Sequence, residues 1–126
     1  MPRTARILMI IGALSLMTAT QLSALGFHAL DLEPAAKESW NWGNQLQFYQ
    51  SLGLVLIGLL AARLGESRLL AAAGALIVVG LCLFSGSIYL QTTGLVPGAG
   101  AVAPMGGGSF MVAWLLVAIA VFRTAR

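Results

Sequence analysis

Four long runs without a charged side chain constrain the fold of this sequence more than any other feature. They extend over residues 7–30, 46–62, 69–90 and 102–122. Crossing about 30 Å of hydrocarbon takes roughly 17 to 25 residues of helix, and each run has that length. A backbone in lipid must satisfy its own hydrogen bonds, which favours helices. The pattern predicts an all-α fold: one integral membrane bundle of four transmembrane helices, with residues 1–126 as a single domain.

Composition excludes a water-soluble globule and gives no support to a nucleic-acid partner. The chain is 59% hydrophobic and 9% charged, against roughly a quarter charged in a soluble protein. Its net charge is +3, but the basic residues stand singly or in pairs beside the apolar runs and form no basic stripe. The expected surrounding is therefore the lipid bilayer. The single cysteine, Cys82, lies inside the third run and is expected to be a small buried residue.

The basic residues also predict the orientation of the helices. One side of the membrane carries six of the seven, namely Arg3, Arg6, Arg63, Arg68, Arg123 and Arg126. The other side carries Lys37, accompanied by Asp31, Glu33 and Glu38. By the positive-inside rule the amino terminus, the second connection and the carboxyl terminus are cytoplasmic. We expect a multi-pass protein of the cell inner (plasma) membrane with both termini in the cytoplasm.

The first run has an alternative interpretation as a cleaved signal peptide. Arg3 and Arg6 precede an apolar stretch that contains small residues such as Ala19 and Ala24. Its apolar character continues to Leu30, beyond the usual signal core of about 7 to 15 residues. We therefore favour a retained helix.

The connections differ in kind. The segment Gly65–Arg68 is short enough for a tight turn, which makes the second and third helices antiparallel neighbours. The first outer connection carries Trp40 and Trp42, which are typical of an aromatic belt at the membrane interface. An acidic residue before Pro34 is also compatible with a short interfacial helix there, and the sequence leaves that question open.

Small residues indicate where helices cross closely, because packing in lipid depends on close backbone approach. In the first run they fall at steps of three or four residues and share one helical face: Gly12, Ser15, Ala19, Ser23 and Gly26. The third run adds Ala71, Ala75, Gly80 and Gly86. We expect the first and third helices to lie at the centre of the bundle.

Polar side chains inside the runs give the only candidate site. Polar residues in the outer halves of the first two helices are expected to meet as a hydrogen-bonded structural network, with a ligand site as the alternative. The residues of this predicted network are Gln21, His28, Gln47, Gln50 and Ser51. The only histidine, His28, has no second histidine, cysteine cluster or carboxylate at a suitable spacing. The sequence thus predicts no catalytic residue, no metal site and no cofactor, and the protein is not expected to be an enzyme.

Two further patterns argue against nucleotide binding and ion-coupled transport. The glycine-rich segment 94–108 lacks the lysine and the following Ser or Thr of a phosphate loop, so we interpret it as an outer loop that leads into the fourth helix. No Asp, Glu, Lys or Arg lies within any run. Ion-coupled transporters commonly depend on such a residue.

Four motifs resemble those of a known family. They are Gly26-Phe27-His28-Ala29-Leu30, Gln47-Phe48-Tyr49-Gln50-Ser51-Leu52, Phe84-Ser85-Gly86-Ser87-Ile88-Tyr89-Leu90, and Ala103-Pro104-Met105-Gly106-Gly107 followed by Trp114. On these the chain is identified as a member of the domain of unknown function 423 family, whose eukaryotic relatives are called transmembrane protein 256. The resemblance implies four helices in a membrane and brings no established activity. Where the family often has a second histidine, this chain has Gln50, which cannot replace histidine as an ordinary metal or haem ligand.

From these observations we expect a small non-enzymatic integral membrane protein of unknown activity. The leading hypothesis is an accessory or structural subunit that packs against a larger membrane complex, with other membrane protein subunits as partners. The alternative is a minor carrier or channel for a neutral or lipophilic solute that uses the polar patch around Gln21 and Gln50.

Overall fold

Helices make up nearly all of the computed structural model, which describes residues 1–65 and 67–124. The first helix, α1 (Arg3–Ala24), is extended by a π-helical turn (Leu25–Ala29). The second segment is the continuous helix α2 (Pro34–Leu64). The third segment consists of α3 (Arg68–Leu81), a π-helical turn (Cys82–Gly86) and α4 (Ser87–Thr92). A 3-10 turn (Ala99–Val102) leads into α5 (Ala103–Thr124).

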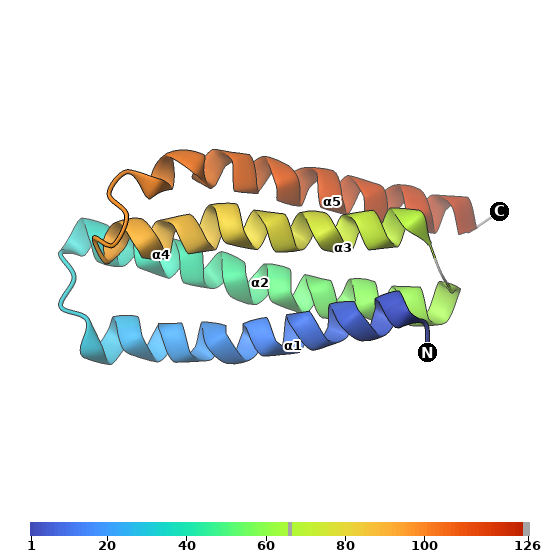
Figure 1. Cartoon of the computed structure of the whole chain (residues 1–126), viewed down its shortest axis with the longest axis horizontal. Helices are drawn as coiled ribbons and strands as arrows, with labels where there is room; N and C mark the ends of the chain where they lie inside the picture. The colour runs from blue at the N-terminus through green and yellow to red at the C-terminus, as the bar shows by residue number, and fades with distance from the viewer. Residues whose placement is uncertain (66, 125–126) are drawn as a thin grey trace.

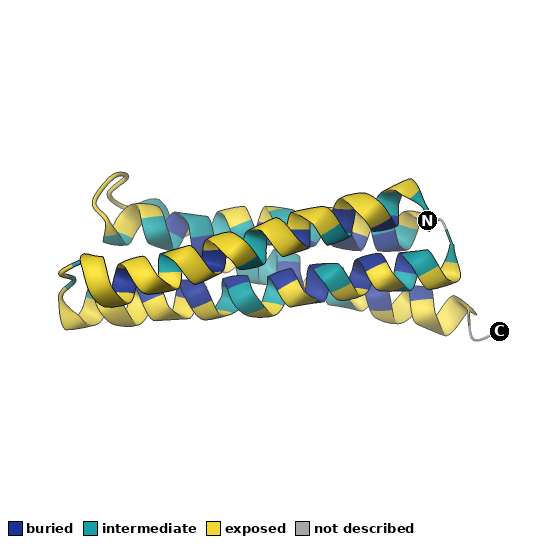
Figure 2. Ribbon diagram, turned by 90° about the horizontal axis from the view of Figure 1, so that it is seen from below, coloured by how far each residue is buried: buried dark blue, intermediate teal, exposed yellow. Residues whose placement is uncertain are grey.

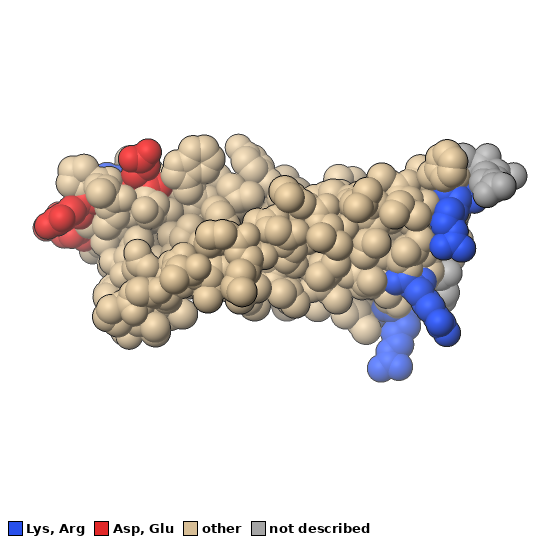
Figure 3. Space-filling view, turned by 90° about the horizontal axis from the view of Figure 1, so that it is seen from above, with Lys and Arg blue, Asp and Glu red and all other residues tan. Residues whose placement is uncertain are grey.

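Among the described residues, four helical segments are long and apolar enough to cross a membrane: Arg3–Ala29, Pro34–Leu64, Arg68–Thr92 and Ala99–Thr124. They run alongside one another, and the amino terminus and the end of α5 lie at the same end of the bundle (Figure 1). Charged side chains gather at the two ends and leave an uncharged band between them (Figure 3). The predicted all-α bundle of four transmembrane helices is confirmed.

The second helix begins at Pro34, whereas the sequence predicted its span to begin at Leu46. Pro34 occupies the first turn, where its fixed φ suits a helix and its missing N–H costs nothing. A helix of 31 residues is about 46 Å long, so α2 exceeds the hydrocarbon core. The polar stretch that we interpreted as a connection is therefore the amino-terminal part of α2, and Trp40 and Trp42 lie on this helix.

The prediction that the first and third helices lie at the centre is wrong for the first. Of the most apolar stretch of each helix, 39% is buried in α2 but only 17% in α1. Figure 1 places α2 and α3 between α1 and α5, and Figure 2 shows mostly exposed residues along α1. The buried core is built from α2, α3 and α5, with smaller contributions from α1.

The turn between α2 and α3 begins at Gly65, whose φ of 91° ends α2, and closes at Ser67, whose Oγ accepts a hydrogen bond from the N–H of Leu70. Glycine tolerates such a positive φ without steric cost. The middle of the turn predicted at Gly65–Arg68, and Arg126 of the predicted cytoplasmic terminus, lie outside the described residues.

Candidate functional site

Side chains of α2 join α1 to α2 by donating hydrogen bonds to backbone carbonyls of α1. The donors are spaced four and three residues apart and so share one helical face. The bonds join Trp40 Nε1 to Leu22 O at 3.0 Å, Asn44 Nδ2 to Ala19 O at 2.9 Å, and Gln47 Nε2 to Ser15 O at 3.0 Å. One turn further, the hydroxyls of Ser15 and Ser51 lie 2.6 Å apart. These bonds hold α1 against α2 although α1 buries little apolar surface.

Tyr89 of α4 joins this contact to the third segment. Its hydroxyl donates to Gln47 Oε1 at 2.7 Å and accepts from Asn44 Nδ2 at 3.2 Å. Its ring lies 4.7 Å from that of Trp40, centroid to centroid. We call the linked side chains the polar network: Ser15, Thr18, Trp40, Asn44, Gln47, Ser51 and Tyr89. Among the described residues, no buried side-chain nitrogen or oxygen lacks a hydrogen-bond partner.

The π-helical turn Cys82–Gly86 lies beside the polar network. A π turn has i→i+5 bonding, so it accommodates an extra residue and changes the direction of the side chains on either side of it. Ser85 is buried and donates to the carbonyl of Gly43 on α2 at 2.6 Å. Tyr89 lies one turn further along and reaches the same helix. The turn therefore coincides with the place where the third segment bonds to α2.

Close backbone approach is required at two glycines. A Cβ on Gly12 would lie 2.7 Å from a methyl group of Val55 and 3.0 Å from the Ser51 carbonyl oxygen. A Cβ on Gly106 would lie 2.5 Å from the amide nitrogen of Phe84 and 2.9 Å from the Gly80 carbonyl oxygen. Because backbone atoms cannot move aside like a flexible side chain, α1 meets α2 and α5 meets α3 at distances that only glycine permits.

The predicted network comes together only in part. Gln47 and Ser51 are buried in the polar network, whereas Gln50 points to another helix and accepts from Trp114 Nε1 of α5 at 2.9 Å. Gln21 and His28 are exposed, and the His28 ring contacts that of Phe27. His28 and Gln50 do not come together, because α2 presents Gln50 to Trp114 of α5, on a different side from α1.

Sequence reasoning missed Trp40, Asn44 and Tyr89 as members of this network. Trp40 was interpreted as an interfacial aromatic residue, but it is only 2% exposed. The signal for Trp40 and Asn44 was the spacing 40, 44, 47, 51, which places four hydrogen-bonding side chains on one face of a helix.

The small residues predicted to pack occupy different surroundings. Gly12, Ser15, Ala19 and Gly26 lie on the side of α1 that faces α2, whereas Ser23 is exposed. In the third segment Gly80 packs against the Phe110 ring. A Cβ on Gly86 would have only the Leu81 carbonyl oxygen nearby, at 3.7 Å. The remaining two, Ala71 and Ala75, line an open groove.

This groove, which we call the α1–α3 groove, separates α1 from the third segment. Its first part has a volume of about 460 Å³ and is lined by Thr4, Ile7, Leu8, Ile11, Ala71, Ala75, Val78 and Val79. Its second part, of about 230 Å³, is lined by Ser15, Leu22, Gln47, Leu81, Cys82, Ser85, Gly86 and Tyr89. The linings of the two parts are about one turn apart on both helices. Cys82, predicted to be buried, is instead exposed in this groove.

In the part of the chain that the structure describes, the arrangement offers hydrogen bonds and no cluster of metal-binding side chains. In residues 1–65 and 67–124, no three His, Cys, Asp or Glu side chains lie close enough together to hold a metal ion. The buried polar side chains are amides and hydroxyls, which bond to one another and to backbone carbonyls. Such groups position helices, and a substrate could reach them only by displacing existing bonds.

Comparison with known proteins finds relatives over nearly the whole chain. Residues 22–107 match a family described as a protein of unknown function, DUF423. The chain is 32% identical to the UPF0382 membrane protein YwdK of Bacillus subtilis, over 94% of this chain and 98% of that protein. It is 34% identical to a UPF0382 membrane protein of Staphylococcus epidermidis, over 95% of this chain and 98% of that protein. No solved structure matches the chain. These matches confirm the resemblance drawn from the four sequence motifs.

Proposed function

The chain belongs to the DUF423 family of membrane proteins of unknown function, and we propose that it acts as a non-enzymatic accessory subunit that packs against a larger membrane complex. The observation that carries this proposal is the open side of α1. Only 17% of the most apolar stretch of α1 is buried. The α1–α3 groove beside it leaves room for side chains of another membrane helix.

The hydrogen bonds within the polar network support a role in helix packing rather than in catalysis or transport. Gln47 uses its amide nitrogen on Ser15 and Thr18 and its carbonyl oxygen on the Tyr89 hydroxyl. A catalytic or transport site needs polar groups that are free to meet a substrate. Groups that are already paired with one another fix the relative positions of α1, α2 and α4, which suits a subunit that presents a constant surface.

The second candidate function is a carrier or channel for a neutral or lipophilic solute. The polar patch first suggested for it does not assemble, because Gln21 is exposed and Gln50 bonds to Trp114. What favours this candidate is the outer part of the α1–α3 groove, where Ser85 and Tyr89 line a space of about 230 Å³. A small uncharged molecule fits such a volume.

Crosslinking in native membranes separates the two candidates. A photoreactive amino acid is placed at Ile11 in the groove, with Leu115 on the exposed side of α5 as the control. Both positions are eight residues from the terminal arginine of their helix, Arg3 or Arg123, so they lie at a similar depth. An accessory subunit gives a protein adduct of one defined mass from Ile11 and none from Leu115.

Adducts of lipid mass only, from both positions, would contradict the accessory proposal. An adduct of one small-molecule mass from Ile11 alone would favour the carrier. The expression level is kept at that of the native gene, so that the partner is not outnumbered.

For location we propose the cell inner membrane, with both termini in the cytoplasm. The arginines of the described residues gather at one end of the bundle, and the acidic residues drawn in Figure 3 lie at the other. The positive-inside rule supports the cytoplasm for the arginine-bearing end.

A further inference from the structure

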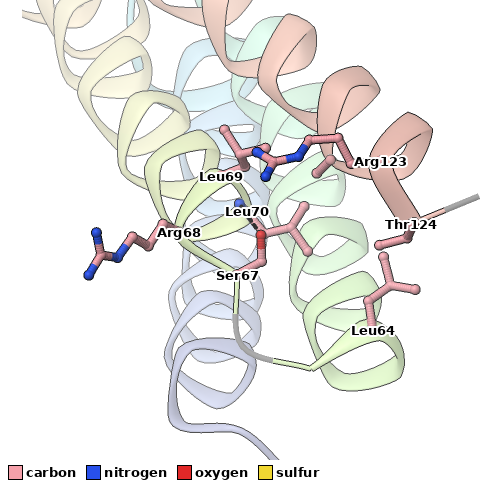
Figure 4. A pocket seen from close by; sticks show the side chains of 8 residues that line it. Leu64, Ser67, Arg68, Leu69, Leu70, Arg123 and Thr124 are labelled. Atoms are coloured by element: carbon pink, nitrogen blue, oxygen red, sulfur yellow. Dashed lines mark hydrogen bonds between the residues drawn. The ribbon is translucent and has the colours of Figure 1, made fainter. Parts of the chain in front are cut away.

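A pocket of about 480 Å³ lies at the arginine-bearing end of the bundle, where α3 begins and α5 ends. Figure 4 shows Arg123 extending from α5 across this space towards Leu69, near Ser67, while Arg68 points outwards from the start of α3. Both arginines are exposed, and neither forms an ion pair with another described residue. We call this space the Arg123 pocket.

The rim of the Arg123 pocket has the chemistry of a phosphate site. A guanidinium offers a planar fork of N–H donors that matches two phosphate oxygens. The Ser67 hydroxyl accepts from the N–H of Leu70 at 3.3 Å, which leaves its own proton to donate. Arg68 also lines the pocket, and its outward-pointing guanidinium adds a second positive charge beside the rim.

The floor of the pocket is apolar. It is formed by Leu64, Leu69, Leu70 and Ala120, the last two of which are buried. A free phosphate ion gains nothing from such a floor. A phospholipid places its phosphate at the rim and the start of its acyl chains against the floor, and this end of the bundle lies at the level of lipid headgroups because the helices span the membrane.

We propose that the Arg123 pocket binds the phosphate of an anionic phospholipid from the adjacent leaflet. The surrounding charge supports the anionic class, because five of the six described basic residues lie at this end of the bundle and the three described acidic residues lie at the other. A zwitterionic lipid would bring its own cation next to the arginines. Basic pockets between membrane helices commonly recognise anionic headgroups in this way. The proposal does not depend on the accessory function.

The test measures lipid binding to the purified full chain in a neutral detergent. Native mass spectrometry counts retained lipids when phosphatidylglycerol or phosphatidylcholine is added at equal concentration. The key variant is Arg123→Gln, and the matched control is Arg6→Gln, which removes an exposed arginine at the same end but outside the pocket. We expect phosphatidylglycerol to bind about fivefold more weakly to Arg123→Gln than to the wild type, and Arg6→Gln to bind like the wild type.

Two further variants test the geometry. Arg68→Gln is expected to weaken binding of phosphatidylglycerol as well, since Arg68 borders the pocket. Arg123→Lys keeps the charge but loses the planar fork of N–H donors. Its affinity for phosphatidylglycerol is therefore expected to lie between those of the wild type and Arg123→Gln. Circular dichroism verifies that each variant is folded; because these side chains are exposed, their replacement leaves the core intact.

Three results would overturn the proposal. Equal weakening by Arg123→Gln and Arg6→Gln would mean general attraction to a positive surface. Equal retention of phosphatidylglycerol and phosphatidylcholine by the wild type would remove the selection for anionic lipid. Competition by millimolar glycerol 1-phosphate as effective as that by the intact lipid would assign the pocket to a soluble phosphate compound.

Discussion

Replacing Gln47 with leucine removes the side chain that links three helical segments. Gln47 makes three short hydrogen bonds to other segments, at 3.0 Å to Ser15 O, 3.1 Å to Thr18 Oγ1 and 2.7 Å from the Tyr89 hydroxyl, and a longer one of 3.4 Å to Ser15 Oγ. A hydrogen bond between membrane helices contributes about 0.6 kcal/mol on average. Three of them sum to about 2 kcal/mol, so we expect Gln47→Leu to lower the free energy of unfolding by about that amount.

The same structure predicts how this loss couples to Tyr89. In Gln47→Leu the Tyr89 hydroxyl still accepts from Asn44, but its proton has no partner in place of Gln47. An unpaired buried donor is itself costly, by about 1 to 3 kcal/mol. Adding Tyr89→Phe removes that donor, so the double variant should be about 1 kcal/mol more stable than the sum of the two single losses predicts.

The assay is reversible unfolding in mixed micelles, followed by tryptophan fluorescence while sodium dodecyl sulfate is increased. Gln45→Leu is the matched control, because Gln45 lies on the same helix and is exposed. We expect it to change stability by no more than about 0.5 kcal/mol. If Gln47→Leu costs no more than this control, or if the cycle with Tyr89→Phe shows no coupling, the polar network does not hold the helices together and the reasoning is refuted.

Three further predictions concern helix packing and orientation. Ala19→Leu should lower the free energy of unfolding by about 1 to 3 kcal/mol, because Ala19 is fully buried against α2. Ala118→Leu, on the exposed side of α5, should have little effect. Equal melting temperatures of the two variants would contradict this. In the same assay Gly106→Ala should destabilise the protein, because its Cβ would meet backbone atoms. Gly107→Ala, with open space around it, should leave the stability unchanged. Similar losses of stability in both variants would argue against the close α3–α5 contact. A reporter enzyme active only outside the cytoplasm should be active when fused in the loop at residues 93–98 and silent at the carboxyl terminus; the reverse pattern would overturn the orientation.

The sequence predicted the four spans well because hydropathy adds up residue by residue and needs no knowledge of contacts. The prediction was wrong for the start of α2, because a helix can extend beyond the hydrocarbon core. The stretch from Pro34 to Gln45 is polar enough to be interpreted as a connection, yet it forms part of the helix. Charge and hydropathy locate the membrane boundary, and only capping residues locate the end of the helix.

The candidate site was predicted less well, because a hydrogen-bond network depends on how each helix is rotated. The sequence gives approximate depth, and Gln47 and Ser51 lie level with Ser15 and Thr18 of α1. It does not give rotation, so Gln50 was grouped with them, although α2 turns it towards Trp114. The π-helical turn before α4 adds a further rotation, and for this reason Tyr89 was not recognised as the partner of Gln47.

The motifs that carry the family resemblance coincide with contacts between helices. Gly26 lies against the Trp40 indole, Gln47 bonds to Tyr89, and Gly106 lies against the backbone of the third segment. Each contact fixes one helix relative to another, and none leaves a polar group free for a substrate. These residues of the motifs therefore hold the helices in their relative positions. On the proposed accessory function, specificity comes from the surfaces that the bundle presents, which are the open side of α1 and the Arg123 pocket.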